Sequence, residues 1–142
     1  MRAAIVEEAR SWLGTPYRHQ AATKGAGCDC LGLLRGVWCA VYGDDPKVPA
    51  YSPDWDEVAQ RDVLLEAARR YLVETPVGER RPGDVILFRM RRGAVAKHLG
   101  ICSGPDQFLH AYDGHGVVES RLSALWSRKV VAVFRFPQIS DL

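Results

Sequence analysis

The spacing of apolar residues along this chain changes near residue 80. Before that point they recur every three to four positions, the period of an amphipathic helix, and after it they alternate with polar residues in short runs, the period of a half-buried strand. Helices followed by strands predict an α+β domain, with N-terminal helices packed on one side of an antiparallel sheet of five to six strands.

Three helices are predicted in the first half of the chain. The first covers residues 2–13 and ends at Gly14. Its buried face is expected to consist of Ile5, Ala9, Trp12 and Leu13. The second begins at Cys30 and is apolar on nearly every side, which predicts a buried helix. The third covers residues 55–72 and is amphipathic, whereas the segment between the first two helices is predicted to be irregular.

Five strands are predicted in the second half, separated by turn signals rich in Gly, Pro and Asp. They lie in the stretches RPGDVILFRM (81–90), VAKHLGICSG (95–104), QFLHAYD (107–113), GVVES (116–120) and KVVAVFRF (129–136). The chain shows no repeat or linker, so residues 1–142 are expected to form a single domain.

Composition narrows the classes of function. The chain is 47% hydrophobic and 25% charged, which is typical of a globular protein, and its formal net charge of +2 is too small to indicate nucleic-acid binding. The cationic clusters at 78–83 and 89–93 are interpreted as solvated surface. No stretch has the ~20 apolar residues of a membrane span, and Glu7 and Glu8 lie where a signal peptide would be apolar. We therefore expect no nucleic-acid or membrane partner, and synthesis in the cytoplasm without a signal peptide.

Cys30 is the cysteine with the clearest chemical rationale. The four cysteines are Cys28, Cys30, Cys39 and Cys102, and their low density favours free thiols, although a Cys28–Cys39 or a Cys39–Cys102 bridge remains an alternative. Cys30 begins the buried helix, where unpaired backbone N–H groups favour a thiolate. We expect this position and a histidine partner to lower the thiol pKa below its usual ~8.5, and we predict a nucleophile.

His98 and His110 are predicted to converge on one hairpin. They lie in neighbouring strands, and a three-residue turn would place them directly opposite one another, whereas a slip of one residue would put them on opposite faces. His19 and His115 lie in loops and are interpreted as ordinary satisfied histidines. Cys30 with the two strand histidines could also bind zinc, but Cys28 and Cys30 lack the usual Cys-x₂₋₄-Cys spacing. We predict no metal.

Five stretches together resemble the motifs of the NlpC/P60 family of cell-wall peptidases. They are GTPY (14–17), DCLGLL (29–34), RPGDVILF (81–88), KHLGICSG (97–104) and FLHAYDGHGVV (108–118), in the family's order. The resemblance runs from about residue 3 to 136 and implies a papain-like fold. It also implies a catalytic triad in which Cys30 is the nucleophile, His98 is the general base and acid, and His110 orients the imidazole of His98.

The resemblance also implies roles for residues near Cys30. The backbone N–H of Cys30 and the hydroxyl of Tyr17 would stabilise the oxyanion, and Asp29 and Tyr17 would lie where family members bind the free amine of the substrate. Asp29 is equally suited to capping the helix, and the two roles are compatible. Leu31 stands where the family usually has a serine that helps to form the substrate subsite, which leaves the fine specificity open.

The function implied by the resemblance is hydrolysis of peptidoglycan stem peptides, with the D-γ-glutamyl–diaminopimelate bond as the expected target. No cofactor is implied. The short form resembles the branch carried by tailed phages and gene transfer agents, so tail or tail-hub proteins are expected partners and the enzyme would be carried in a particle tail to the periplasmic cell wall. The alternatives are an inert structural tail protein, an amidase or acyltransferase on the same fold, and, more weakly, a zinc-binding module.

Overall fold

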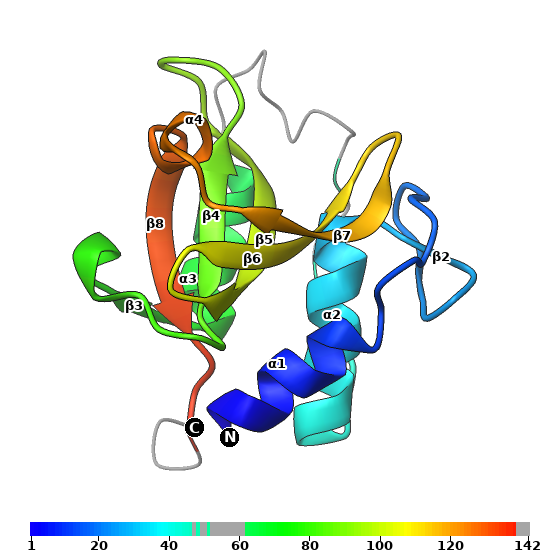
Figure 1. The fold of residues 1–142 in the computed structure, drawn as a ribbon. Coiled ribbons are helices and arrows are strands. Elements are labelled where there is room, and N and C mark those ends of the chain that lie inside the picture. The colour runs from blue at the N-terminus through cyan, green and yellow to red at the C-terminus, as the bar shows by residue number, and fades with distance from the viewer. Residues whose placement is uncertain (47, 49–50, 52–61, 139–142) are drawn as a thin grey trace.

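The computed structural model describes residues 1–46, 48, 51 and 62–138, and it is built around a six-stranded antiparallel sheet (Figure 1). In spatial order, the strands are β3 (Val73–Thr75), β8 (Val130–Arg135), β4 (Val85–Arg89), β5 (Ala96–Gly104), β6 (Gln107–Tyr112) and β7 (Gly116–Arg121). The helices are α1 (Arg2–Arg10), α2 (Cys30–Tyr42), α3 (Val63–Tyr71), the short α4 (Ala124–Ser127) and the 3₁₀ helix η1 (Val77–Glu79). The predicted α+β architecture and the antiparallel sheet are confirmed.

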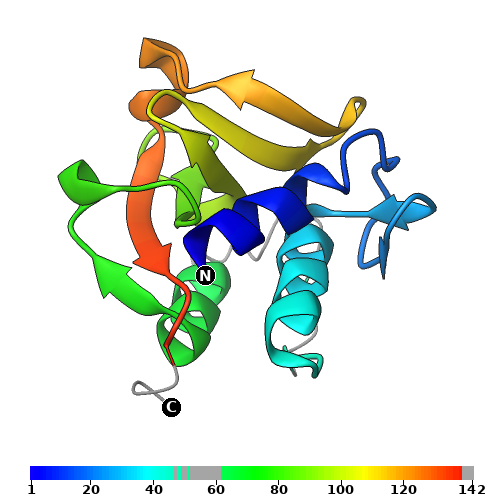
Figure 2. The same ribbon diagram turned by 60° about the horizontal axis from the view of Figure 1, so that its bottom comes forward.

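The sheet separates two apolar layers. Helices α1, α2 and α3 cover one face, and α4 lies over the other (Figure 2). Because side chains alternate between the faces of a strand, Leu87 and Leu99 join the main core beneath the helices, while Phe88 and Phe108 join a smaller cluster beneath α4. This division places His98 and His110 on the strand positions that face the α4 side.

The first and third predicted helices differ from the observed ones at their ends. Helix α1 ends at Arg10, after which the backbone tightens into three-residue turns that lead Gly14 to hydrogen-bond Val117, so Leu13 is 45% exposed and not buried as predicted. The prediction of one continuous helix over 55–72 is wrong at Asp62, which has a non-helical backbone (φ −88°, ψ 60°) and directly precedes α3. Residues 55–61 lie outside the described residues.

Two pieces of strand structure were not predicted. The segment expected to be irregular contains a two-stranded ribbon of β1 (Ala22–Thr23) and β2 (Gly27–Cys28). Strand β3 follows α3 and pairs with β8 as an edge of the main sheet. Both are too short for an alternating pattern to be visible in the sequence. None of the described helices is long and apolar enough to cross a membrane.

Candidate active site

Helix α2 begins at Cys30, and its N-terminus is fixed by the side chain of Asp29. One carboxylate oxygen of Asp29 accepts a hydrogen bond from the backbone N–H of Gly32 at 2.7 Å, and the other accepts from the backbone N–H of Gln20 at 2.7 Å and from the hydroxyl of Tyr51. The capping role predicted for Asp29 is therefore confirmed. Its carboxylate is buried and already bound by donors of the chain, while the predicted contact with a substrate amine stays a prediction.

Gly32 allows the preceding loop to lie against the first turn of α2. A Cβ atom at residue 32 would lie 1.8 Å from the carbonyl oxygen of Ala21, a distance that no side chain can occupy. The same loop carries Tyr17, which forms a parallel bridge with Cys28. The close approach at Gly32 thus brings the Tyr17 segment beside the start of the helix.

His98 and His110 meet on the other side of the site. The distance from Nε2 of His98 to Nδ1 of His110 is 2.8 Å, so the predicted convergence on one hairpin is confirmed. They are not directly opposite one another, because a two-residue turn and a bulge near Ser103 set Ile101 opposite Leu109 and leave the histidines on one face, offset diagonally.

Ser120 extends this histidine pair and was missed in the sequence. Its Oγ lies 2.8 Å from Nε2 of His110. Val118 of β7 is opposite His110, and Ser120 lies two residues further along the same face, so strand alternation is the signal that would have found it. The described residues therefore include a hydrogen-bonded chain from His98 through His110 to Ser120.

The direction of these bonds follows from the chemistry required of His98. With Nε2 turned toward His110, Nδ1 is the nitrogen of His98 that remains for a thiol proton, so the proton of neutral His98 must sit on Nε2. That proton is donated to Nδ1 of His110, which then donates its own proton from Nε2 to Ser120. The hydroxyl of Ser120, which can accept this proton, is compatible with the tautomer in which His98 can act as a base.

The thiol of Cys30 lies against the strand that carries His98. Backbone N–H groups of Leu99, Leu31 and Cys30 itself face the sulfur and favour its negative form, and Leu99 directly follows His98 in β5. Both Cys30 and His98 are described, and no hydrogen bond joins the thiol to the His98 ring in this state. The two halves of the site adjoin through the backbone of β5, and proton transfer requires the thiol and the ring to close up.

Burial controls the protonation of the Cys30 thiol and of the His98 imidazole. It raises the pKa of the Cys30 thiol to about 12, with a further contribution from the Asp29 carboxylate. Burial also lowers the pKa of His98 to about 3, assisted by the neighbouring charges of His110, Lys129 and Lys97. The expectation of a lowered thiol pKa is wrong for the free protein, because loss of hydration outweighs the helix N–H groups. The resting pair is a neutral thiol and a neutral imidazole.

Tyr17 is half-buried next to the thiol. Burial, followed by the negative charges that Cys30 and Asp29 carry when ionised, raises the pKa of Tyr17 to about 12. The hydroxyl therefore keeps its proton at neutral pH and can donate a hydrogen bond. Its predicted role as an oxyanion donor and substrate contact needs this protonated form and stays a prediction.

The remaining cysteines and histidines lie outside the His98–His110–Ser120 hydrogen-bonded chain. All four cysteines are free, which confirms the predicted thiols and removes the two disulfide alternatives. His115 stacks on Tyr112 in an exposed loop, whereas Nδ1 of His19 lies 3.8 Å from the Asp29 carboxylate, closer to the site than expected. Within the described part of the chain, no three His, Cys, Asp or Glu side chains are placed to hold a metal ion.

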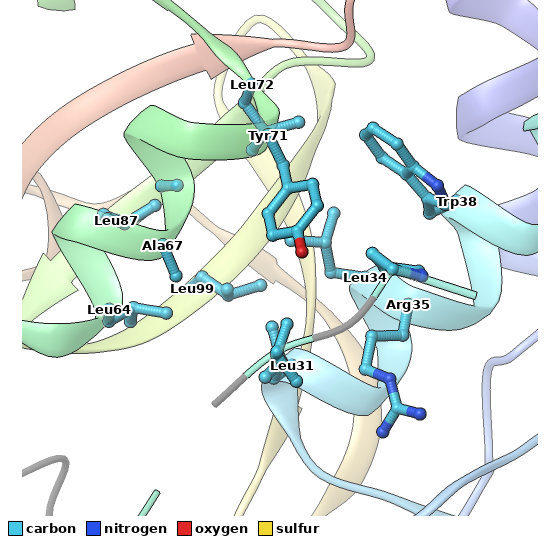
Figure 3. A pocket seen from close by; sticks show the side chains of 13 residues that line it. Leu31, Leu34, Arg35, Trp38, Leu64, Ala67, Tyr71, Leu72, Leu87 and Leu99 are labelled. Carbon is cyan, nitrogen blue, oxygen red and sulfur yellow. The ribbon is translucent and has the colours of Figure 1, made fainter. Parts of the chain in front are cut away.

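An apolar pocket between α2 and α3 adjoins the site (Figure 3). Leu31 and Leu34 from α2 point toward Leu64 from α3 and Leu99 from β5, and Arg35 lies at its rim. Leu31 directly follows Cys30, and Leu99 directly follows His98. The leucine at position 31 therefore forms part of an apolar wall immediately beside the predicted catalytic residues.

The chain is similar to known proteins. Residues 14–135 match the model of the NlpC/P60 family. The chain is 27% identical over 129 residues to the murein DD-endopeptidase MepS/murein LD-carboxypeptidase of Escherichia coli K12, covering 91% of this chain and 59% of that protein. It is 27% identical over 139 residues to the gamma-DL-glutamyl hydrolase of Bacillus subtilis 168, covering 96% of this chain and 30% of that protein.

The fold also matches solved structures. The NlpC/p60 domain of the peptidoglycan hydrolase SagA superposes with a TM-score of 0.68 at 23% identity, covering 96% of this chain and 99% of that one. This likeness shows a papain-like α+β fold. With the family match spanning the helix that bears Cys30 and the strands that bear both histidines, the chain belongs to the NlpC/P60 family.

Proposed function

We propose that this protein is a cysteine endopeptidase that hydrolyses peptidoglycan stem peptides. The observation that carries the proposal is the His98–His110 hydrogen bond, set beside a cysteine at the N-terminus of a buried helix. A thiol, a base and a group that orients the base are the parts required for acyl transfer. The names of the relatives from E. coli and B. subtilis supply the substrate class, because they act on murein and on γ-glutamyl bonds.

The proposed mechanism begins from the neutral pair. When a substrate brings the groups together, Nδ1 of His98 takes the thiol proton and the sulfur of Cys30 attacks the scissile carbonyl carbon. The backbone N–H of Cys30 and the hydroxyl of Tyr17 stabilise the oxyanion. The tetrahedral intermediate collapses to a thioester as His98 returns the proton to the leaving amine. Water, deprotonated by His98, then hydrolyses the thioester and regenerates the thiol.

The bond that we propose is the one between D-γ-glutamate and diaminopimelate. Support comes from the γ-glutamyl specificity in the name of the B. subtilis relative and from the family resemblance of the motifs around Cys30 and His98. The test is mass spectrometry of fragments released from purified sacculi. Release of fragments that end in γ-D-glutamate supports this bond, whereas cleavage between muramic acid and the first amino acid would identify an amidase instead.

The same assay tests the nucleophile. Cys30→Ala and His98→Gln should abolish fragment release. The first substitution removes the attacking sulfur, and the second removes the base that accepts its proton. Cys39→Ala is the matched control, since Cys39 is another free cysteine of α2 that lies away from the helix start. Equal release by wild type and Cys30→Ala would reject the proposal.

We also propose that the enzyme is carried in the tail of a phage-like particle and reaches the periplasmic wall during entry, with tail or tail-hub proteins as its partners. The support is the resemblance of its short motif set to that branch of the family. Mass spectrometry of particles purified from producing cells should detect the protein with the tail fraction. Its recovery only in the free cytosolic fraction would contradict the particle role.

A further inference from the structure

A groove lined by cationic residues lies at the end of the sheet near His98. One wall comes from the end of β4 and the turn that follows, and the other from α4 and the two residues between α4 and β8. The backbone N–H of Arg89 donates to the carbonyl of Lys129 at 2.8 Å, which joins the two walls. We call this the cationic groove, and it is lined by Arg89, Met90, Arg91, Arg92, Leu125, Arg128 and Lys129.

The cationic groove has an unusual local charge balance. Neither residues 85–105 nor residues 120–138, which supply its walls, contain an aspartate or a glutamate. In the described part of the chain, no ion pair involves Arg89, Arg92, Arg128 or Lys129. Cations gathered in a concave surface attract anions. The sequence alone suggested solvated surface for 89–93, because it does not show that Arg128 and Lys129 lie across from that cluster.

The cationic groove is also close to the predicted catalytic base. Nζ of Lys129 lies 5.2 Å from the centroid of the Trp126 ring, and that ring lies 5.8 Å from the His98 ring. Phe88, which precedes Arg89, pairs directly with His98 in the sheet. An extended peptide advances about 3.3–3.6 Å per residue, so Lys129 lies within roughly three residues of the His98 ring.

We propose that the cationic groove binds the free carboxylates of an acidic peptide substrate that extends from the cleavage point. This rests on the proposed peptidase function and names the substrate feature that is recognised. A γ-linked glutamate keeps its α-carboxylate free, so a γ-glutamyl peptide presents a negative charge at each such residue. Arginine guanidinium groups bind carboxylates through paired N–H donors, and the groove supplies arginines on both of its walls.

Binding can be measured without catalysis in the Cys30→Ala protein by isothermal titration calorimetry. The probe is a γ-linked D-glutamate trimer, compared with the same trimer in which each α-carboxylate is an amide. We expect the acidic trimer to bind more tightly, and its affinity to fall as salt is raised. Arg92→Gln with Arg128→Gln should weaken the acidic trimer about tenfold, which is the loss of two charge-assisted contacts at an exposed surface.

The matched control is Arg70→Gln with Arg81→Gln, which removes the same charge from exposed positions outside the groove. It should leave the affinity unchanged. Equal affinity for the acidic and amidated trimers, or equal weakening by both double variants, would overturn the proposal. Polyphosphate that displaces the acidic trimer only from proteins with Arg92 and Arg128 intact would confirm the groove as its site. Polyphosphate binding without any preference for the acidic trimer would assign the groove to phosphate polymers and reject the peptide.

Failure of this proposal differs from failure of the proposed function. Fragment release from sacculi reports the chemistry of Cys30, whereas the trimer titration reports only the cationic groove. Loss of discrimination between the two trimers, with fragment release intact, would reject the groove alone. Trimer binding in a protein that releases no fragments would reject the peptidase and keep the groove.

Discussion

Ser120 touches neither the thiol nor a substrate, and its effect passes through the two histidines. Ser120→Ala removes the hydrogen-bond partner of His110 Nε2, so the tautomer of His98 that can take a thiol proton loses the acceptor that supports it. A lost hydrogen bond of about 1 kcal/mol predicts a roughly fivefold to tenfold lower kcat with little change in KM. The measurement is hydrolysis of a soluble muropeptide.

Two further measurements distinguish a role of Ser120 in orienting the histidines from general damage to the fold. Nitrogen NMR of histidine-labelled protein should show a changed tautomer at His110 in Ser120→Ala, and Ser120→Thr, which keeps a hydroxyl, should restore both the spectrum and kcat. A parental spectrum together with a parental kcat in Ser120→Ala would show that the serine hydroxyl has no part in orienting the histidines.

The raised pKa of the Cys30 thiol makes a prediction about its reactivity in the free protein. Because the thiol stays protonated at neutral pH, iodoacetamide should label Cys30 slowly at pH 7, and the rate should still be rising at pH 10. The labelling of the Cys30 peptide is followed by mass spectrometry, with urea-unfolded protein as the reference. Rapid labelling that does not change between pH 6 and pH 9 would instead indicate a preformed thiolate.

At the residue scale, the sequence pattern predicted the positions of the candidate site residues better than their protonation states. The helix start at Cys30 and the meeting of His98 with His110 follow from local spacing, so both could be predicted. The hydrogen bond from Tyr51 to Asp29 depends on a loop path set by tertiary packing, and no local signal marks it. The direction of the thiol pKa was wrong because the depth of burial depends on the whole fold.

At the scale of elements, the packing of α2 against the turn that follows α1 depends on one glycine. A Cβ atom at Gly36 would lie 2.0 Å from the buried ring of Trp12. Gly36→Ala should therefore lower the free energy of unfolding by about 1–3 kcal/mol through overpacking, despite the better helix propensity of alanine. Urea unfolding followed by circular dichroism measures the change.

Gly78→Ala is the matched control for that substitution. Its Cβ atom would meet no other atom within 4 Å, and it should change the stability by no more than a few tenths of a kcal/mol. A Gly36→Ala protein as stable as the control would mean that Trp12 does not fix the position of α2 against the turn that follows α1.

The elements that were predicted correctly are those with several turns or several alternations. Helix α2 and the strands of the central sheet have long apolar patterns, and packing against one another reinforces them. Strand β3 and the β1–β2 ribbon are held by partners distant in sequence or by a tight loop, so their local composition carries little signal. The non-helical backbone at Asp62 interrupts an amphipathic pattern that continues across it, which is why periodicity alone placed residues 55–72 in one helix.

At the scale of the whole molecule, the histidine pair packs in the smaller apolar layer beneath α4, on the opposite face of the sheet from the main core that contains Cys30. The layer beneath α1, α2 and α3 holds most of the buried apolar side chains, whereas the layer beneath α4 places Trp126 and Phe88 around His98 and His110. These aromatic rings exclude water and keep both imidazoles neutral. The same packing that prepares His98 as a base therefore makes the fold sensitive to acid.

This coupling predicts how stability depends on pH. Burial lowers the pKa of His98 to about 3 and that of His110 to about 4, against an ordinary value of 6.5. Below pH 6.5 the unfolded chain binds protons that the folded chain does not, so the stability present above pH 6.5 is lost as the pH falls toward 4. Each histidine contributes up to about 1.4 kcal/mol per pH unit in that range. Urea unfolding at pH 7.5, 6, 5 and 4 should show this slope. His110→Gln should reduce this slope strongly. His115→Gln, which removes an exposed charge that helps to lower the pKa of His110, should reduce it less. A flat profile in the parent protein would show that the two buried imidazoles are protonated without cost to the fold.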